Sequence, residues 1–391
     1  MSFDVGSGRL AGVPRSGPAP VSIQDELAAA HRHLRAELPE VTRVAAALYD
    51  RHTDQLTTFV NSTEGSTPLS HYQVRVAEVP SLKELAASGR DRVIDDLSVL
   101  AGSPSEHSQA LLGRWGSSFT RPLYENGHLR GFLFFDAEPR AYFTPAVVQR
   151  LAVFADFVAL LLASSLFPLR MLKSAVQVAS RVTHRRDPET GAHLDRMAHY
   201  ARLIALALAP DHARDDAWVE HVFRFAPLHD IGKVAIPDRV LLKAGPLTDE
   251  EFDLMKTHAL EGAAMIEQVL DDLGADSLPD AELLSHIVRY HHERFDGRGY
   301  PDGLVGSDIP LEARIVAVAD VFDALTSARP YKEAWSFERA FGYLEEQAGH
   351  HFDPCCVEAL VAGADEAAEI RSAFPDAPDA TRLREGYGRE L

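Results

Sequence analysis

The second half of the chain contains histidine and acidic residues at spacings that suit metal binding. Glu189 and His193 are four residues apart, so a helix in this segment would place both side chains on one face. His229 and Asp230 are adjacent, and further members follow at longer intervals. The complete set is Glu189, His193, His229, Asp230, His258, His291, His292 and Asp320.

This ligand set favours a cluster of transition-metal ions. Imidazoles mixed with carboxylates suit iron, manganese or zinc better than calcium or magnesium. The set exceeds the needs of one ion, so we expect two or three ions, iron or manganese above all, with bridging carboxylates and an open position for water. Water bound by two cations has a lowered pKa and can attack a phosphodiester, so the expected chemistry is hydrolysis.

Other polar residues nearby receive structural interpretations. A single histidine more often has a packing or surface role than a ligand role. The histidines given that role are His199, His221, His286, His350 and His351. Asp323 lies one helical turn after Asp320, and we expect it to hydrogen-bond to a ligand rather than to bind metal itself.

Three longer motifs surround the candidate ligands: His229-Asp230-Ile-Gly-Lys233, His291-His292-Glu-Arg-Phe-Asp-Gly-Arg-Gly-Tyr-Pro301, and Ala319 to Lys332 with its Thr-Ser-Ala-Arg-Pro-Tyr-Lys ending. In this order they resemble the HD-GYP family, over residues 169–370. Family members are all-helical phosphodiesterases of the HD superfamily that hydrolyse cyclic di-GMP in bacteria.

The resemblance implies roles for individual residues. The metal positions of the family correspond to the ligand set above, and Glu189 corresponds to a glutamate associated with three metals rather than two. The substrate-contacting cations correspond to Lys233, Arg329 and Lys332. We expect Asp230 and Lys233 to be catalytic.

Two further residues of the glycine-rich segment are candidate substrate contacts. Gly299 lies in the loop of residues 297–301, where glycine can let backbone approach a ligand closely. The loop could instead be a rigid turn that shapes the pocket, and the two roles are compatible. Tyr300 could stack on guanine.

The predicted function is hydrolysis of cyclic di-GMP to pGpG, GMP or both, regulated by an N-terminal sensory domain. Two alternatives stay open. The first is a non-catalytic cyclic di-GMP receptor, and the second is a phosphodiesterase for another cyclic dinucleotide such as cyclic GMP-AMP. GGDEF-type proteins are considered as partners.

Composition limits the class of partner and the compartment. The net charge of −19 over 391 residues argues against binding of a nucleic-acid polymer through a basic surface. The cysteines, Cys355 and Cys356, are adjacent and predict no disulfide framework, which suits a cytoplasmic protein. The apolar run 151–167 is short for a membrane span and contains Asp156, so we expect no membrane insertion.

The first half of the chain has the pattern of an α+β domain with an antiparallel sheet. Residues 1–20 are rich in glycine and proline and predict a disordered leader. Ser22 and Asp25 predict the start of a helix. Two hairpins are expected, one around His52-Thr53-Asp54 and one at Asn126-Gly127. This order resembles a GAF-type sensory domain over residues 21–143, and a dimerisation or packing module without a ligand is the alternative.

The remaining segments predict helices. Thr144-Pro145 opens a connector helix over residues 144–168, which Pro168 should kink or break. Its apolar residues predict a homodimer, and packing within its own chain is the alternative. Residues 169–370 are expected to be all-α, with His258 on a helix that the capping box Thr248 to Glu251 opens. Residues 371–391 read as a polar tail.

Overall fold

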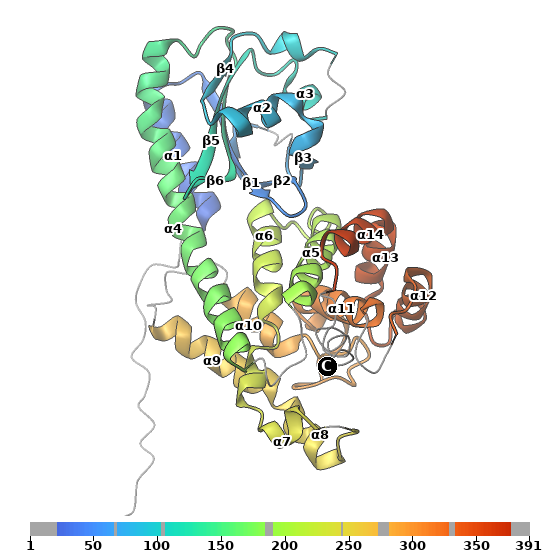
Figure 1. Ribbon diagram of the computed structural model, residues 1–391. Coiled ribbons are helices and arrows are strands. Elements are labelled where there is room, and N and C mark those ends of the chain that lie inside the picture. The colour runs from blue at the N-terminus through green and yellow to red at the C-terminus, as the bar shows by residue number, and fades with distance from the viewer. Residues whose placement is uncertain are drawn as a thin grey trace, which may run out of the picture.

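The computed structural model describes residues 22–65, 69–102, 106–183, 191–243, 245–272, 281–327 and 333–376. Figure 1 shows a sheet with flanking helices above a helical body, with one long helix running alongside both. This arrangement confirms the predicted class of an α+β domain with an antiparallel sheet followed by an all-α region. The predicted disordered leader lies outside the described residues.

The N-terminal domain is built on one six-stranded antiparallel sheet with the strand order β3-β2-β1-β6-β5-β4. The strands are β1 (Val41–Asp50), β2 (Gln55–Thr63), β3 (Gln73–Arg75), β4 (Arg92–Ile94), β5 (Ser117–Glu125) and β6 (His128–Ala137). Both predicted hairpins are present, as β1 with β2 and β5 with β6. Asn126 and Gly127 have φ angles of 52° and 78°, the positive values that a tight hairpin turn requires.

Helices cover both faces of this sheet. Phe132 and Phe134 of β6 belong to a core under η1 (Val76–Glu78) and α2 (Pro80–Ser88). Leu133 and Phe135 point to the other face and join the core with α1 (Ile23–Glu37) and α4 (Pro145–Thr183). The Ser22 side chain caps α1 by accepting a hydrogen bond from the Asp25 amide, as predicted. Two short helices, η2 (Leu97–Leu100) and α3 (Glu106–Leu111), complete the domain.

The helix α4 has two different apolar faces. Leu151, Ala155, Val158, Leu162 and Leu166 are buried in the core that α1 shares, so the alternative of packing within the chain holds for this stripe. The second face carries Val153, Phe157 and Leu160, which are 71%, 49% and 66% exposed.

Of the predicted kink or break at Pro168, the break is wrong, because α4 continues to Thr183. Proline inside a helix removes one hydrogen bond and costs about 3 kcal/mol, which disfavours a continuous helix without forbidding it.

The described residues that follow α4 are mainly helical. Its elements are α5 (Gly191–Leu208), α6 (Asp216–Phe225), η3 (Ala226–Leu228), η4 (Ile231–Ala235), α7 (Asp238–Leu241), α8 (Asp249–Lys256), α9 (His258–Asp272), α10 (Ala281–Tyr290), η6 (Gly306–Asp308), α11 (Leu311–Thr326), α12 (Phe337–Gln347), α13 (Pro354–Ala362) and α14 (Ala364–Ala373). Within the described part, only isolated bridges such as Asp296 with Val305 resemble strand pairing. The buried helix α11 packs against α5 and α10. The helix α14 continues past the predicted domain end at residue 370.

One predicted helix is two helices. The capping box of Thr248 and Glu251 is formed and opens α8, but this helix ends at Lys256. His258 is instead the first residue of α9. The interruption turns the chain at Thr257, which the apolar pattern of the sequence does not mark.

Candidate metal centre

The predicted metal ligands within the described residues lie in two groups. In the first group, Asp230, His258, His291 and His292 offer ligand atoms within 4.8 Å of one another. In the second group, the same holds for His193, His229 and Asp320. The remaining predicted ligand, Glu189, lies outside the described residues.

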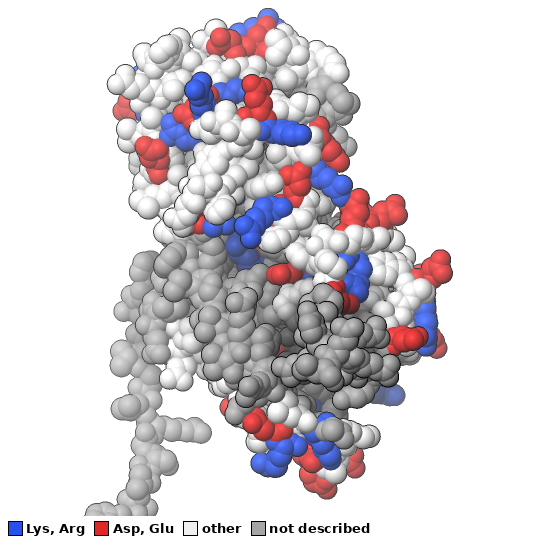
Figure 2. All heavy atoms as spheres, in the orientation of Figure 1, with Lys and Arg blue, Asp and Glu red and all other residues white. Residues whose placement is uncertain are grey.

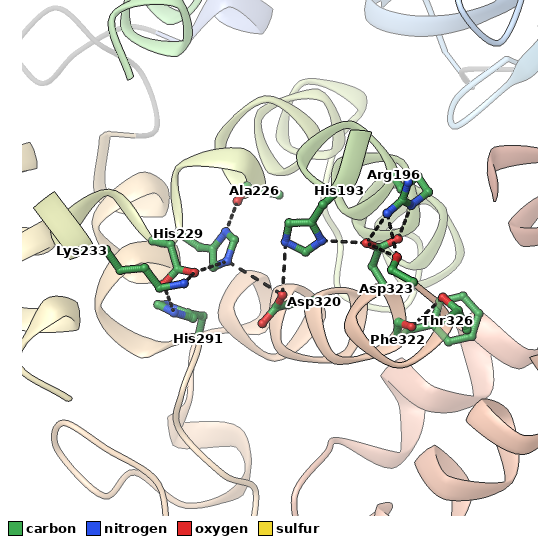
Figure 3. A network of polar contacts seen from close by, with 12 residues as sticks. His193, Arg196, Ala226, His229, Lys233, His291, Asp320, Phe322, Asp323 and Thr326 are labelled. Carbon is green, nitrogen blue, oxygen red and sulfur yellow. Dashed lines mark hydrogen bonds and ion pairs between the residues drawn. The ribbon is translucent and has the colours of Figure 1, made fainter. Parts of the chain in front are cut away.

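The ligands come from elements far apart in the sequence. His193 lies on α5 and Asp320 on α11, two helices that pack together. His229 and Asp230 lie between the short helices η3 and η4. Figure 3 shows His193 and His229 directed toward Asp320, with distances from Nε2 to Oδ1 of 3.7 Å and 4.0 Å.

Hydrogen bonds orient the buried imidazoles toward the centre. The Nδ1 atoms of His229 and His258 lie 2.9 Å and 2.8 Å from the carbonyl oxygens of Ala226 and Met255. Nδ1 of His291 lies 3.1 Å from the Ile287 carbonyl oxygen. A proton on Nδ1 leaves Nε2 as the free base, which is the usual arrangement of histidine ligands.

Asp230 belongs to the first group and also contacts the second. One carboxylate oxygen, Oδ1, is 3.2 Å from Nε2 of His258 and 3.6 Å from Nε2 of His291. The other, Oδ2, is 3.1 Å from Nε2 of His229. Burial alone would raise the pKa of Asp230, but the charge of Lys233 and the contact with His229 hold it well below its usual value. An ionised carboxylate facing both groups is suited to bridge two cations.

His193 has a carboxylate partner away from the centre. Its Nδ1 lies 2.7 Å from Oδ2 of Asp323, so Asp323 acts through a ligand, as predicted. Arg196 in turn donates to Asp323 from Nε at 2.5 Å and from Nη2 at 2.9 Å. The side chains of Arg196 and Asp323 are fully buried, so this ion pair fixes the carboxylate that fixes His193 (Figure 3).

The protonation states suit cation binding. Burial lowers the pKa of His291, and burial together with the neighbouring His291 holds that of His292 well below its usual value. Neutral imidazoles are the form that ligates metals. The donor types, the ring orientations and the carboxylate that contacts both groups therefore fit divalent cations.

Close backbone packing holds the His229-Asp230 segment in place. A Cβ on Gly232 would lie 1.9 Å from the carbonyl oxygen of His258, so only glycine allows η4 to approach α9 this closely. Lys233 follows Asp230 by three residues, and its Nζ lies 2.5 Å from Oδ2 of Asp230. The Lys233 side chain is 21% exposed. Lys233 therefore lies at the edge of the centre.

The glycine-rich loop is held by a buried carboxylate. Glu293 accepts hydrogen bonds from the amides of Asp302 at 2.8 Å, Gly303 at 2.9 Å and Leu304 at 3.2 Å. A Cβ on Gly299 would meet the Arg294 amide at 2.3 Å. These contacts support the alternative of a rigid turn for Gly299.

Tyr300 brings the loop to the centre. Its ring centroid is 4.8 Å from that of His292 and 6.4 Å from that of His258. An aromatic face therefore borders the first group of ligands, where a base could stack.

Some of the predicted residues are not part of the described centre. The predicted substrate-binding Arg329 and Lys332 lie outside the described residues. His199 and His286, given structural roles, bond to the carboxylates of Asp50 and Glu312 rather than entering the centre.

The sequence interpretation did not identify the positioning roles of Arg196 and Glu293. Arg196 follows His193 by three residues and so shares its helix face, which is a signal that could have indicated it. Glu293 directly follows the His291-His292 pair, but its bonds reach forward across the loop to residues 302–304, which no local pattern shows.

Comparison with known proteins shows what this part of the chain is similar to. Residues 170–356 match the family model described as HD domain. The chain is 48% identical over 198 residues to the cyclic di-GMP phosphodiesterase response regulator RpfG of Xanthomonas campestris, covering 51% of this chain and 50% of the relative. It is 38% identical over 206 residues to the 3'3'-cGAMP-specific phosphodiesterase 2 of Vibrio cholerae, covering 52% and 37%. The chain thus spans about half the length, or less, of these curated relatives.

A solved structure is similar to part of the chain. It is described as the GAF domain/HD domain protein from Geobacter sulfurreducens, at 15% identity and a TM-score of 0.28, covering 36% of this chain and 92% of that one.

Proposed function

We propose that this chain, whose residues 170–356 match the HD domain family model, hydrolyses a phosphodiester bond of cyclic di-GMP with the help of divalent metal ions. The observation that carries the proposal is the buried pair of ligand groups with Asp230 in contact with both. Similarity to relatives named as cyclic di-GMP phosphodiesterases supports the choice of substrate.

The centre would hold two or three ions, with iron or manganese preferred. One ion would be held by the group with His258, His291 and His292, and another by the group with His193 and Asp320. The expectation of a third ion depends on Glu189 as a further ligand. Bound ions would lower the pKa of a water molecule and offset the phosphate charge in an acidic protein.

The residues of the chain bind and orient the substrate. Lys233, at the edge of the centre, would contact the phosphate or the departing oxygen. Tyr300 would stack on a guanine beside His292. Arg329 and Lys332 would add cationic contacts to phosphate, with the arginine able to form two hydrogen bonds at once.

Product analysis tests this function. Purified protein is loaded with iron or manganese without oxygen, incubated with cyclic di-GMP, and the nucleotides are separated. We expect linear pGpG, GMP or both. Tight binding of intact cyclic di-GMP by a metal-loaded protein that releases no product would instead establish the receptor alternative.

Cyclic GMP-AMP is the second candidate substrate. It is favoured by the similarity to Vibrio cholerae proteins named as 3'3'-cGAMP-specific phosphodiesterases. The same assay with both dinucleotides at equal concentration decides between them. A kcat/KM for cyclic GMP-AMP above that for cyclic di-GMP would reverse our order of preference.

The second apolar face of α4 supports a homodimer. Val153, Phe157 and Leu160 recur at helical spacing and are exposed, and an apolar stripe of this kind suits pairing with its copy. The helix over residues 145–166 also has the length and apolarity of a membrane span, and 22% of its most apolar 18-residue stretch is buried. However, Arg150 and Asp156 on this helix pair with Glu37 and Arg121 of the N-terminal domain. These ion pairs favour a helix packed on its own domain, and we keep the cytoplasmic assignment.

Surface charge supports a small nucleotide rather than a polymer as partner. On the face in Figure 2, the Lys and Arg side chains that are coloured are interspersed with Asp and Glu. A polymer-binding surface would gather basic residues into a continuous patch. GGDEF-type partners stay a prediction.

A further inference from the structure

Four buried polar residues recur at intervals of three along α5. His193 belongs to the metal centre, and Arg196 holds its partner Asp323. Further along, Nε2 of His199 lies 2.6 Å from Oδ2 of Asp50, at the end of β1. Arg202 donates to the side chain of Gln55, at the start of β2, at 2.7 Å. The helix that supplies a metal ligand is therefore also the helix that the β1–β2 turn contacts, as Figure 1 shows at the junction of the two domains.

Phe374 forms a second connection between the turn and the centre. Its ring centroid is 5.7 Å from that of His52 in the β1–β2 turn and 4.8 Å from that of His199. Its carbonyl oxygen accepts a hydrogen bond from Nη1 of Arg196 at 2.8 Å. The residue thus contacts the turn, α5 and the Arg196–Asp323 pair at once.

These contacts are buried, so breaking one of them is energetically costly. The side chains of His199 and Arg202 are 5% exposed and that of Asp50 is 15% exposed. Burial alone would raise the pKa of Asp50, but the hydrogen bond from His199 and the charge of Arg202 hold it below its usual value. Removing one member of such a set leaves a buried polar group unpaired, so the turn and α5 are held in one relative position.

A different contact between the domains is exposed rather than buried. Arg75 of β3 pairs with Glu369 of α14, and these side chains are 38% and 54% exposed. Exposed pairs contribute little to stability. Arg75 pairs with α14 rather than with α5, so it offers a matched control at the same interface.

We propose that the β1–β2 turn, residues 50–55, sets the position of α5 and through it the affinity of the metal centre. In this arrangement Arg196 is a positioning residue for His193, and Asp50, Gln55 and Phe374 are the groups through which the N-terminal domain acts on it. The inference rests on the proposed function, because it assigns the regulation of that same centre.

The test measures Mn²⁺ affinity by titration of metal-free, full-length protein, without substrate. Asp50→Ala should weaken Mn²⁺ binding by about tenfold, the lower end of what loss of an orienting contact around a metal site costs. Asp50→Asn, which keeps an acceptor for His199, should restore most of the affinity. Arg75→Ala should leave the affinity unchanged.

A double-mutant cycle separates this route from general loosening of the fold. Asp323→Asn should itself weaken Mn²⁺ binding. Asp50→Ala added to it should lower the Mn²⁺ affinity by less than about twofold more, because the Asp323 carboxylate that links Arg196 to His193 is already lost. The proposal would be overturned if Asp50→Ala weakened Mn²⁺ binding by the same factor in wild-type and in Asp323→Asn protein. It would also be overturned if folded Asp50→Ala protein bound Mn²⁺ with wild-type affinity. If Asp50→Ala does not fold, Gln55→Ala, which removes the bond to Arg202, takes its place in the cycle with the same expectations. Because Mn²⁺ affinity is read without substrate, a failed hydrolysis assay would not decide this result.

Discussion

His193 and Asp323 are 130 residues apart in the sequence, and Nδ1 of the imidazole lies 2.7 Å from Oδ2 of the carboxylate. Arg196 holds the same carboxylate from its other side. A predicted metal ligand, its orienting partner and the group that fixes the partner are thus linked in one buried chain of contacts.

Asp323→Asn should weaken metal binding by about 10- to 100-fold, because the His193 ring loses its charged partner. The substitution preserves shape, so the helical circular dichroism signal should persist. Isothermal titration with Mn²⁺ measures the change. Asp253→Asn, at an exposed pair with Lys256, is the matched control. Unchanged Mn²⁺ affinity in folded Asp323→Asn protein would contradict the orienting role.

Asp230→Ala should abolish turnover and lower metal content, because both ligand groups lose the carboxylate that contacts them. Metal analysis and nucleotide hydrolysis are measured on the same preparation. Lys233→Met should reduce kcat while the metal content stays intact, since Lys233 contacts the carboxylate but offers no ligand. Retained activity with full metal occupancy in Asp230→Ala would place the centre elsewhere.

Glu189→Ala should lower the metal count by about one ion if this carboxylate holds a third ion. If Glu189 only stabilises the start of a helix, the count should stay the same and the loss should be at most about 1 kcal/mol of stability. Metal content and melting temperature of the same variant distinguish these results. An unchanged count would leave an enzyme with two ions.

Phe157→Glu should convert a dimer to a monomer, because it places a charge in the exposed stripe with Val153 and Leu160. Light scattering at micromolar concentration measures the mass. Gln149→Glu, at an exposed site on the same helix, should leave the dimer intact. A wild-type protein that is already monomeric would refute the dimer.

Acid should destabilise the protein through His351. Burial and the neighbouring Arg294 lower the pKa of His351 to about 4, below the value of about 6.5 for an unfolded histidine. Between these values the unfolded chain binds the proton more readily, so the free energy of unfolding should fall as pH falls. Urea unfolding of metal-free protein at pH 7 and pH 5 measures this. His351→Phe should reduce the difference while keeping the stacking on Phe352, and an equal difference in both proteins would rule out His351 as its source.

The sequence by itself determined the features that depend on residue type and short spacing. Ser22 and Asp25 marked the start of α1, and Asn126-Gly127 marked the tight hairpin, because capping and positive φ are properties of a few adjacent residues. The candidate ligands could likewise be identified by their types and motifs.

Only the tertiary structure decided how these features act together. The contacts of Asp230 with both ligand groups, the pairing of His193 with Asp323 and the contact of His199 with Asp50, 149 residues away, all depend on how buried helices pack. The continuation of α4 through Pro168 and the start of α9 at His258 also departed from local signals. Local propensities contribute about 1 to 3 kcal/mol each, whereas tertiary packing sums over many buried side chains and can override them.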